Sequence, residues 1–155
     1  MLKIRIDPVI AKSLIEAFTK LVDEVYFIAT KEKLMISQVD SSKVIGIYME
    51  IAGEGLPELV VDEEKKFGIS SQYLKIIARM INKRSDKIFE MKEGQTGLIL
   101  RVEGRRIREL EVPMLPPGDL VVDISMWDKA AEYYKDGGAV ITYTTDEFYR
   151  PVSYT

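Results

Sequence analysis

The chain has 155 residues, with 22 Lys and Arg against 25 Asp and Glu, which gives a formal net charge of −3. It contains no Cys and no His, which excludes disulfides, Cys-ligated zinc, iron–sulfur clusters and catalytic systems that depend on histidine. Its length and its hydrophobic content of 46% favour one folded domain with a short appendage, and no apolar run is long enough to cross a bilayer.

The first elements follow in chain order from the period of the apolar residues. Ile4 and Ile6 alternate with charged residues, which predicts a strand, and Asp7 and Pro8 are typical of the start of a helix. The apolar face of that helix holds Ile10, Leu14, Ala17, Phe18 and Leu21. Three strands are then expected at about 25–30, 34–39 and 44–51.

The same order then begins again. Residues 54–58 indicate a loop, and 59–61 and 66–69 are short apolar pieces. A second helix is expected from a Ser70 or Ser71 cap, with its apolar face on Leu74, Ile77, Ala78 and Ile81. Strands follow at about 87–92, 97–103 and 106–114. The order β-α-β-β-β therefore occurs twice, with a period of roughly 60 residues.

Residues 117–155 predict a short linker and a partial third unit of order β-α-β-β. A strand is expected at 120–124, a helix that starts near Ser125 and buries Trp127, and a hairpin from 139–144 and 148–154. This region is acidic, with three basic residues against seven acidic ones from Asp119 onward.

Positive charge gathers on the second helix. Lys75, Arg79 and Lys83 recur every four residues, and no acidic residue is placed to pair with them along that face. Such a stripe could contact phosphates without reading bases, although a solvated helix face is the alternative. Lys12 and Lys20 on the first helix form a weaker basic stripe, because the acidic Glu16 lies between them.

Other charged motifs point to simpler structures. Residues 105–108 suggest either a nucleic-acid patch or a turn with solvated arginines that leads into a strand. Residues 40–43 are typical of a turn rather than of a serine nucleophile with a lysine partner. Asp119 and Asp123 are too few to make a cation site. The sequence thus predicts no catalytic residue, no metal ligand and no cofactor.

Several segments resemble a known family in their order and spacing. Residues 1–116 are similar to the N-terminal domain of sliding clamps of the proliferating cell nuclear antigen (PCNA) family, in particular the archaeal type. The matching pieces are Leu21-Val22-Asp23-Glu24, Val39-Asp40-Ser41-Ser42-Lys43-Val44, Phe67-Gly68-Ile69-Ser70-Ser71-Gln72-Tyr73-Leu74-Lys75-Ile76-Ile77 and Arg108-Glu109-Leu110-Glu111-Val112-Pro113-Met114-Leu115.

The resemblance implies an α+β DNA-clamp fold, with helices on one face of antiparallel sheets and a domain boundary near residue 116. By position, the DNA-facing residues would be Lys12, Lys20, Lys75, Arg79 and Lys83. An apolar pocket for partner peptides would include Val39, Val44 and Leu115. The candidate edge for assembly is the strand that carries Arg106, Arg108, Leu110 and Val112.

Two functions follow from this resemblance. The first is a reduced, non-enzymatic sliding clamp that assembles by edge-strand pairing, encircles duplex DNA without sequence specificity and tethers polymerases, nucleases or a clamp loader. The second is a truncated regulator that binds a full-length clamp through an exposed sheet edge and does not itself encircle DNA. A small carboxylate- or lysine-based enzyme is the remaining alternative. The composition, with one Asn and three Gln, indicates a thermophilic source and a reducing, cytoplasmic, nucleoid-associated protein.

Overall fold

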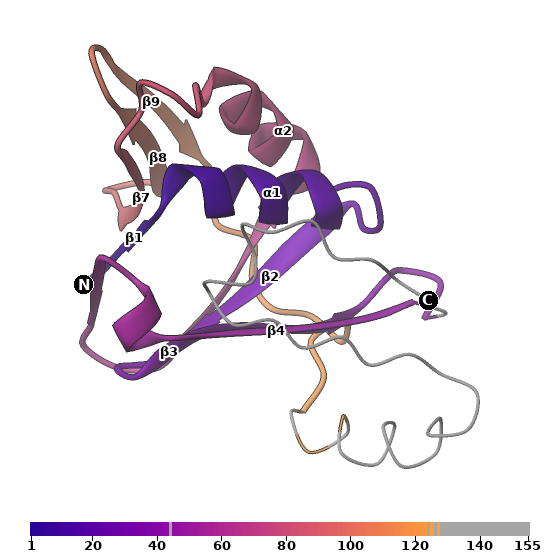
Figure 1. The fold of residues 1–155 in the computed structure, drawn as a ribbon. Helices are drawn as coiled ribbons and strands as arrows, with labels where there is room; N and C mark the ends of the chain where they lie inside the picture. Colours follow the sequence, from indigo (N-terminus) through magenta and orange to yellow (C-terminus); the bar gives the residue numbers. More distant parts are fainter. Residues whose placement is uncertain (44, 124, 126, 128–155) are drawn as a thin grey trace, which may run out of the picture.

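Two antiparallel sheets and two α-helices make up the part of the chain that the computed structural model describes, namely residues 1–43, 45–123, 125 and 127 (Figure 1). The first half contains β1 (Leu2–Ile6), α1 (Pro8–Phe18), β2 (Glu24–Ala29), β3 (Lys33–Val39), β4 (Gly46–Ala52) and the short 3₁₀ turn η1 (Gly53–Gly55). The second half contains β5 (Glu58–Val61), β6 (Lys65–Ser70), α2 (Ser71–Met80), β7 (Ile88–Glu93), β8 (Leu98–Glu103) and β9 (Ile107–Val112).

The two β-α-β-β-β units exchange their first strands. The strand order is β5-β1-β7-β8-β9 in one sheet and β4-β3-β2-β6 in the other. Strand β1 thus pairs with β7 of the second unit, and β6 pairs with β2 of the first. This exchange links the units into one body, and β5 adds a strand that the simple repeat does not predict.

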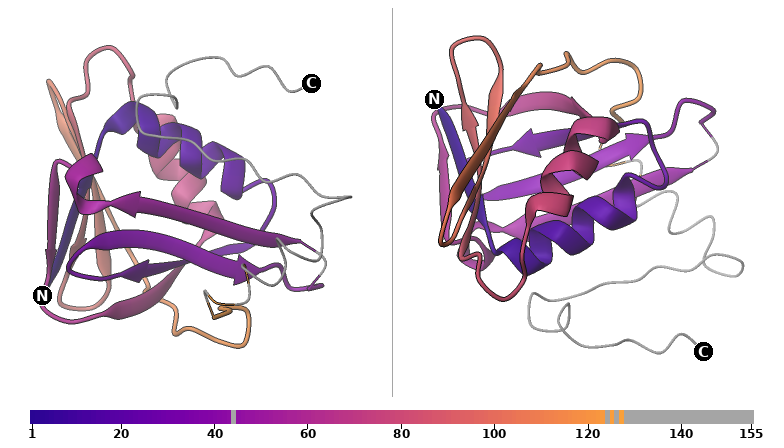
Figure 2. Two further views of the ribbon diagram at one scale, coloured as in Figure 1. Left: turned by 60° about the horizontal axis from the view of Figure 1, so that its bottom comes forward. Right: turned by 90° about the horizontal axis from the view of Figure 1, so that it is seen from above.

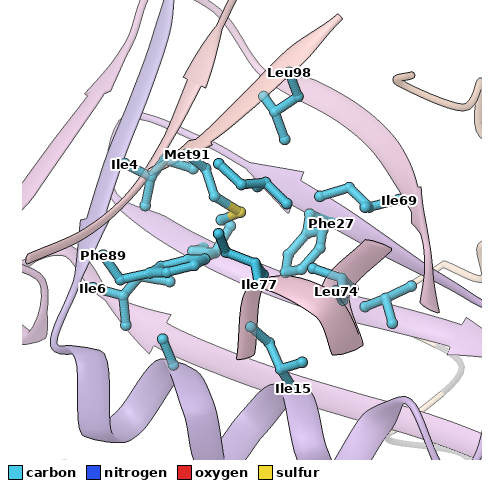
Figure 3. Close-up of a cluster of buried hydrophobic side chains, with 14 of the residues drawn as sticks. Ile4, Ile6, Ile15, Phe27, Ile69, Leu74, Ile77, Phe89, Met91 and Leu98 are labelled. Carbon is cyan, nitrogen blue, oxygen red and sulfur yellow. The ribbon is translucent and has the colours of Figure 1, made fainter. Parts of the chain in front are cut away.

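The helices α1 and α2 lie side by side on one side of the sheets, as both views in Figure 2 show. Between helices and sheets lies a single apolar core, to which α1 contributes Ile15 and α2 contributes Leu74 and Ile77 (Figure 3). Phe27 and Phe67 stack at its centre with ring centroids 5.5 Å apart. The predicted α+β class, with helices on one face of antiparallel sheets, is confirmed.

The first helix begins where the sequence predicts. The carboxylate of Asp7 accepts a hydrogen bond from the backbone N–H of Val9 at 2.9 Å, and Pro8 occupies the first helical position, where its missing N–H costs nothing. The helix ends at Phe18, so Leu21 lies beyond it and is exposed rather than part of the apolar face. The expectation for Leu21 was wrong because the helix is one turn shorter.

The second helix differs from the prediction at both of its ends. It ends at Met80, and Ile81 already has extended backbone, so Lys83 is not on the helix. Neither candidate serine caps the N-terminus with its side chain. Ser70 makes no such bond, and the Ser71 hydroxyl donates instead to the carbonyl oxygen of Val22 at 2.6 Å. This bond ties the start of α2 to the end of the α1–β2 connection.

Only the start of the predicted third unit can be compared with the structure. Residues 120–122 run beside β3, with an isolated antiparallel bridge between Val121 and Gln38. The expected remainder of the helix that starts near Ser125 and the expected hairpin at 139–144 and 148–154 lie outside the described residues.

Candidate functional site

Exposed cations lie on the helix pair. Lys75 and Arg79 are exposed on α2, and Lys20 is exposed in the turn that follows α1. Within the described part of the chain, none of the three makes an ion pair or a side-chain hydrogen bond. Their charge is therefore available to an external anion.

Lys12 has a different environment. Its ammonium donates hydrogen bonds to the carbonyl oxygens of Ala78 at 2.7 Å and Ile81 at 3.4 Å, and lies 3.6 Å from the Glu16 carboxylate. The Ala78 carbonyl belongs to the last turn of α2 and Ile81 is the residue that follows the helix, so the ammonium lies at the helix C-terminus, where a positive charge also interacts favourably with the helix dipole. Lys12 thus joins the two helices, and less of its charge is directed to solvent than the sequence suggests.

Lys83 lies in the turn that follows α2. The side-chain oxygen of Asn82 accepts from the backbone N–H of Arg84 at 2.9 Å and of Ser85 at 3.3 Å, which stops the helix and forms the turn. Lys83 is exposed there, beyond the last helical carbonyls. The four-residue spacing that linked it to Arg79 is therefore not a helical relationship.

A second cluster of cations lies where two turns of the five-stranded sheet and α2 meet. The turn at 82–87 packs against the turn at 104–106, because the Lys87 N–H donates to Glu103 at 2.8 Å and Gly104 lies so close that a Cβ there would be 2.8 Å from the Ser85 carbonyl. This contact gathers exposed cations from both turns. We call them the basic corner: Lys83, Arg84, Lys87, Arg105 and Arg106.

The acidic residues next to the basic corner are already paired. Asp86 is almost fully buried and accepts a hydrogen bond from the Arg108 guanidinium, and Glu103 lies 3.5 Å from Arg101. No ion pair involves any cation of the basic corner among residues 1–43, 45–123, 125 and 127. The sequence did signal a surplus of positive charge near residue 84, but only the strand pairing brings residues 105 and 106 beside it.

The predicted assembly edge is the last strand of the five-stranded sheet. Strand β9 pairs with β8 on one side, and its other side has no partner strand among the described residues. Val112 is buried and Leu110 packs against the core, so these side chains face inward. Arg108 also faces inward, donating to the Met80 carbonyl at 2.6 Å, whereas Arg106 lies in the preceding turn and is exposed.

Apolar side chains are exposed next to this edge. On α2, the strand's neighbour, Tyr73, Ile76 and Met80 form a stripe at helical spacing, each about two-fifths exposed. Ile107, the first residue of β9, is 57% exposed. Exposed apolar groups beside an unpaired strand edge are typical of a surface that another chain covers.

Two of the three predicted pocket residues lie at one end of the four-stranded sheet. Val39 ends β3, and Leu115 pairs with Gly68 of the edge strand β6; both side chains are partly exposed. Val44 lies outside the described residues. Between them, the Tyr26 N–H donates to the side-chain oxygen of Gln38 at 2.7 Å.

Within the described residues there is no group of three or more acidic side chains that could hold a metal ion. No helix in that part of the chain is long and apolar enough to span a membrane.

Comparison with known proteins gives the family. Residues 1–113 match the model of the N-terminal domain of proliferating cell nuclear antigen. The chain belongs to the PCNA family. This confirms the resemblance drawn from the sequence and the α+β clamp fold that it implied.

Sliding clamps of two archaea are similar to most of this chain. The chain is 25% identical over 109 residues to the DNA polymerase sliding clamp of Methanothermobacter thermautotrophicus, covering 70% of this chain and 44% of that protein. It is 29% identical over 119 residues to DNA polymerase sliding clamp 1 of Sulfurisphaera ohwakuensis, covering 73% and 49%. The chain thus spans about half the length of these relatives.

A solved structure agrees on the fold. The crystal structure of PCNA from Thermococcus kodakaraensis superimposes with a TM-score of 0.72 over 80% of this chain and 50% of that one, at 17% sequence identity. At this identity the likeness establishes the fold alone.

Proposed function

We propose that this chain is a reduced sliding clamp, a non-enzymatic processivity factor that assembles around duplex DNA and tethers replication or repair enzymes. The observation that carries the proposal is a set of exposed cations that have no ion-pair partner among the described residues: Lys75 and Arg79 on α2, and Lys20 in the turn directly after α1. In this proposal Lys12 and Lys83 belong to the same DNA-facing surface.

The chemistry of these groups suits sliding. Lysine and arginine side chains contact phosphate oxygens, which repeat identically along a duplex and carry no sequence information. A protein held only by such contacts can move along DNA without breaking base-specific bonds. The overall net charge of −3 limits attraction to DNA elsewhere on the molecule.

Assembly would use the side of β9 that pairs with no strand in the described part of the chain. Main-chain groups there can pair with a strand of another chain. The α2 stripe supplies exposed apolar area on the inner side of this edge, and Ile107 supplies it on the outer face of the sheet. In this proposal the edge keeps its position because three of its side chains pack inward, namely Arg108, Leu110 and Val112. Arg106 lies in the turn before the strand. Partner proteins would bind by apolar peptides near Val39, Val44 and Leu115.

DNA binding provides the test. We expect the affinity for a fluorescein-labelled duplex to fall steeply with salt, and the double variant Lys75→Ala/Arg79→Ala to reduce the slope of log K against log[salt] by roughly two. The matched control is Lys31→Ala/Lys66→Ala, which removes the same charge from exposed positions outside the helix pair. Equal slopes for the two double variants would refute the assignment of the helix cations to DNA.

A second candidate function uses the same edge differently. Because one side of β9 has no partner strand among the described residues and the chain spans about half the length of its relatives, it could pair with a full-length clamp as a regulator that does not encircle DNA. This candidate predicts a stable mixed complex with an archaeal sliding clamp and weak binding to duplex DNA, both measurable by size-exclusion chromatography with light scattering.

A further inference from the structure

The segment after β9 is bonded across the end of the four-stranded sheet. We call residues 113–122 the strap. Leu115 exchanges two backbone hydrogen bonds of 2.8 Å with Gly68, on the outer edge of β6. Further along, the Val39 N–H donates to Leu120 at 2.8 Å, and the Val122 N–H donates to Ser37 at 3.1 Å. The strap therefore connects β6 with β3, passing the end of β2 that lies between them.

A buried amide makes room for the strap. Regular pairing of β2 with β3 stops at Phe27 and Ile36. Beyond that point the side chain of Gln38, which is fully buried, bridges the two strands, accepting from Tyr26 and donating to the Glu24 carbonyl at 2.9 Å. The strands separate there, and residues 120–122 pair with the side of β3 that β2 has left.

The outer face of this sheet carries buried apolar side chains as well. Phe27 points into the main core, so its neighbours Tyr26 and Ile28 point to the opposite face, where Met35 also lies. All three are at most 5% exposed although they do not belong to the main core. This face is therefore covered rather than open to water.

Trp127 occupies a fitted position on that face. Its indole Nε1 donates to the Ser37 hydroxyl at 2.7 Å, and that hydroxyl donates to the Val122 carbonyl at 2.7 Å. The indole lies 5.7 Å from the Tyr48 ring, centroid to centroid. Gly46 provides the space, because a Cβ there would lie 2.8 Å from Cη2 of Trp127.

This position adjoins the residues assigned to partner peptides. Val39 lies opposite Gly46 in the β3–β4 pairing, and its N–H is already bonded to the strap. Leu115 is itself part of the strap. A peptide that pairs with the Val39 N–H would have to displace the strap, which is also bonded to Ser37, the residue that accepts the hydrogen bond from Trp127.

We propose that Trp127 is an internal occupant of the partner-peptide surface, seated between Ser37, Gly46 and Tyr48, and that partner peptides bind in competition with it. The proposal rests on the peptide surface assigned under Proposed function, but the seating of Trp127 can be measured without any partner. The contact is an autoinhibitory one, since the chain masks its own docking surface until Trp127 leaves.

The single tryptophan of the chain makes the seating directly observable. We expect its fluorescence in the full chain to be blue-shifted and protected from iodide, relative to the chain unfolded in guanidinium. Gly46→Val should shift the emission toward that of the unfolded chain and increase iodide quenching, with the circular dichroism spectrum unchanged. Gly118→Val is the matched control, because nothing lies within 4 Å of a Cβ at Gly118.

A second variant keeps the proposal testable if Gly46→Val does not fold. Ser37→Ala removes the hydroxyl that holds the indole N–H, and we expect it to change Trp127 fluorescence in the same direction as Gly46→Val. Emission of the parent chain equal to that of the unfolded chain would overturn the proposal. So would spectra of both variants that match those of the parent and of Gly118→Val.

Competition is tested with a peptide of the chain's own sequence. The probe is a fluorescein-labelled peptide of residues 121–129, measured by anisotropy against the full chain and against Trp127→Ala. We expect binding to Trp127→Ala to be at least about tenfold tighter than to the parent, and to be lost in Gly46→Val/Trp127→Ala. Equal affinity for parent and Trp127→Ala, or no binding to either, would overturn the proposal.

The outcomes separate the two proposals. Seating of Trp127 and self-peptide binding do not require DNA or a ring, so their failure leaves the clamp function standing. Conversely, loss of the helix-dependent DNA binding described above would refute the clamp function while the Trp127 spectra stayed as expected.

Discussion

The ammonium of Lys12 lies 2.7 Å from the carbonyl oxygen of Ala78 and thereby ties α1 to the C-terminus of α2. The two helices that carry the candidate DNA-facing cations are thus fixed to each other by one of those cations. Rigid mutual placement matters here, because phosphate contacts at several points are made together only if their spacing is fixed.

We expect Lys12→Ala to lower the free energy of unfolding by about 1–2 kcal/mol, since it leaves helix-terminal carbonyls without a charged donor. Urea unfolding followed by circular dichroism measures the change. Lys20→Ala is the control and should stay within about 0.5 kcal/mol of the parent, because Lys20 has no partner among the described residues. Equal effects for the two variants would contradict the role of Lys12 as a link between the helices.

The pair of Asp86 and Arg108 also holds the C-terminal end of α2, because the Arg108 guanidinium donates to the carbonyl oxygen of Met80, the last residue of that helix. The Asp86 side chain is 1% exposed, and it also accepts from the Asn82 N–H at 2.6 Å. Asp86→Ala leaves the Arg108 guanidinium half-buried without its carboxylate, so we expect a loss of about 3–5 kcal/mol in the free energy of unfolding. Arg106→Ala, at an exposed position in the same turn region, should change it by less than about 0.5 kcal/mol. A loss below 1 kcal/mol for Asp86→Ala would mean that the pair does not hold this end of the helix.

The basic corner predicts additional DNA contacts. If a duplex on the helix pair extends over the turn after α2, the triple variant Arg84→Ala/Lys87→Ala/Arg105→Ala should reduce the slope of log K against log[salt] by roughly two to three. The measurement is the same duplex titration as for the helix cations, with Lys31→Ala/Lys66→Ala/Lys92→Ala, at three exposed positions elsewhere, as the charge-matched reference. A slope equal to that of the reference would show that the corner does not contact the DNA.

Tyr26 predicts a loss of stability in alkali. Burial of its ring, followed by the hydrogen bond that its hydroxyl donates to Glu24, raises the pKa of Tyr26 from 10.0 to about 12. Because the folded state favours the neutral phenol, this contribution is complete below pH 10 and is lost as the pH rises from 10 towards 12. At pH 11 the loss is about 1 kcal/mol in the free energy of unfolding.

The measurement compares urea unfolding at pH 9 and pH 11 for the parent and for Tyr26→Phe. The variant lacks the titrating group, so its decrease between the two pH values should be smaller than that of the parent by about the same amount. Equal decreases would assign the alkaline instability to other groups.

Elements with a clear apolar period were predictable. The Asp7-capped start of α1 and the positions of most strands follow from local sequence, and the family follows from the order of several short segments. The end of α2 was not predictable from spacing. Lys83 continues the four-residue pattern of Lys75 and Arg79, and what stops the helix is the local bonding of Asn82 together with the buried pair of Asp86 and Arg108.

For the candidate site, too, local features could be predicted from sequence and long-range contacts could not. Exposed cations on one helix face could be identified from sequence, because their spacing is local. The attachment of Lys12 to Ala78, the meeting of the turns at 82–87 and 104–106, and the seat of Trp127 depend on residues that are far apart in the chain. The peptide surface at Val39, Val44 and Leu115 stays a prediction.

Light scattering coupled to size-exclusion chromatography, over a wide range of protein concentration, tests the central claim most directly. We expect a discrete closed oligomer whose mass does not grow with concentration. It should dissociate when Ile107→Lys places a charge at the start of β9, the strand with no partner on one side among the described residues. A chain that stays monomeric at every concentration, alone and with duplex DNA, would contradict an assembly that encircles DNA.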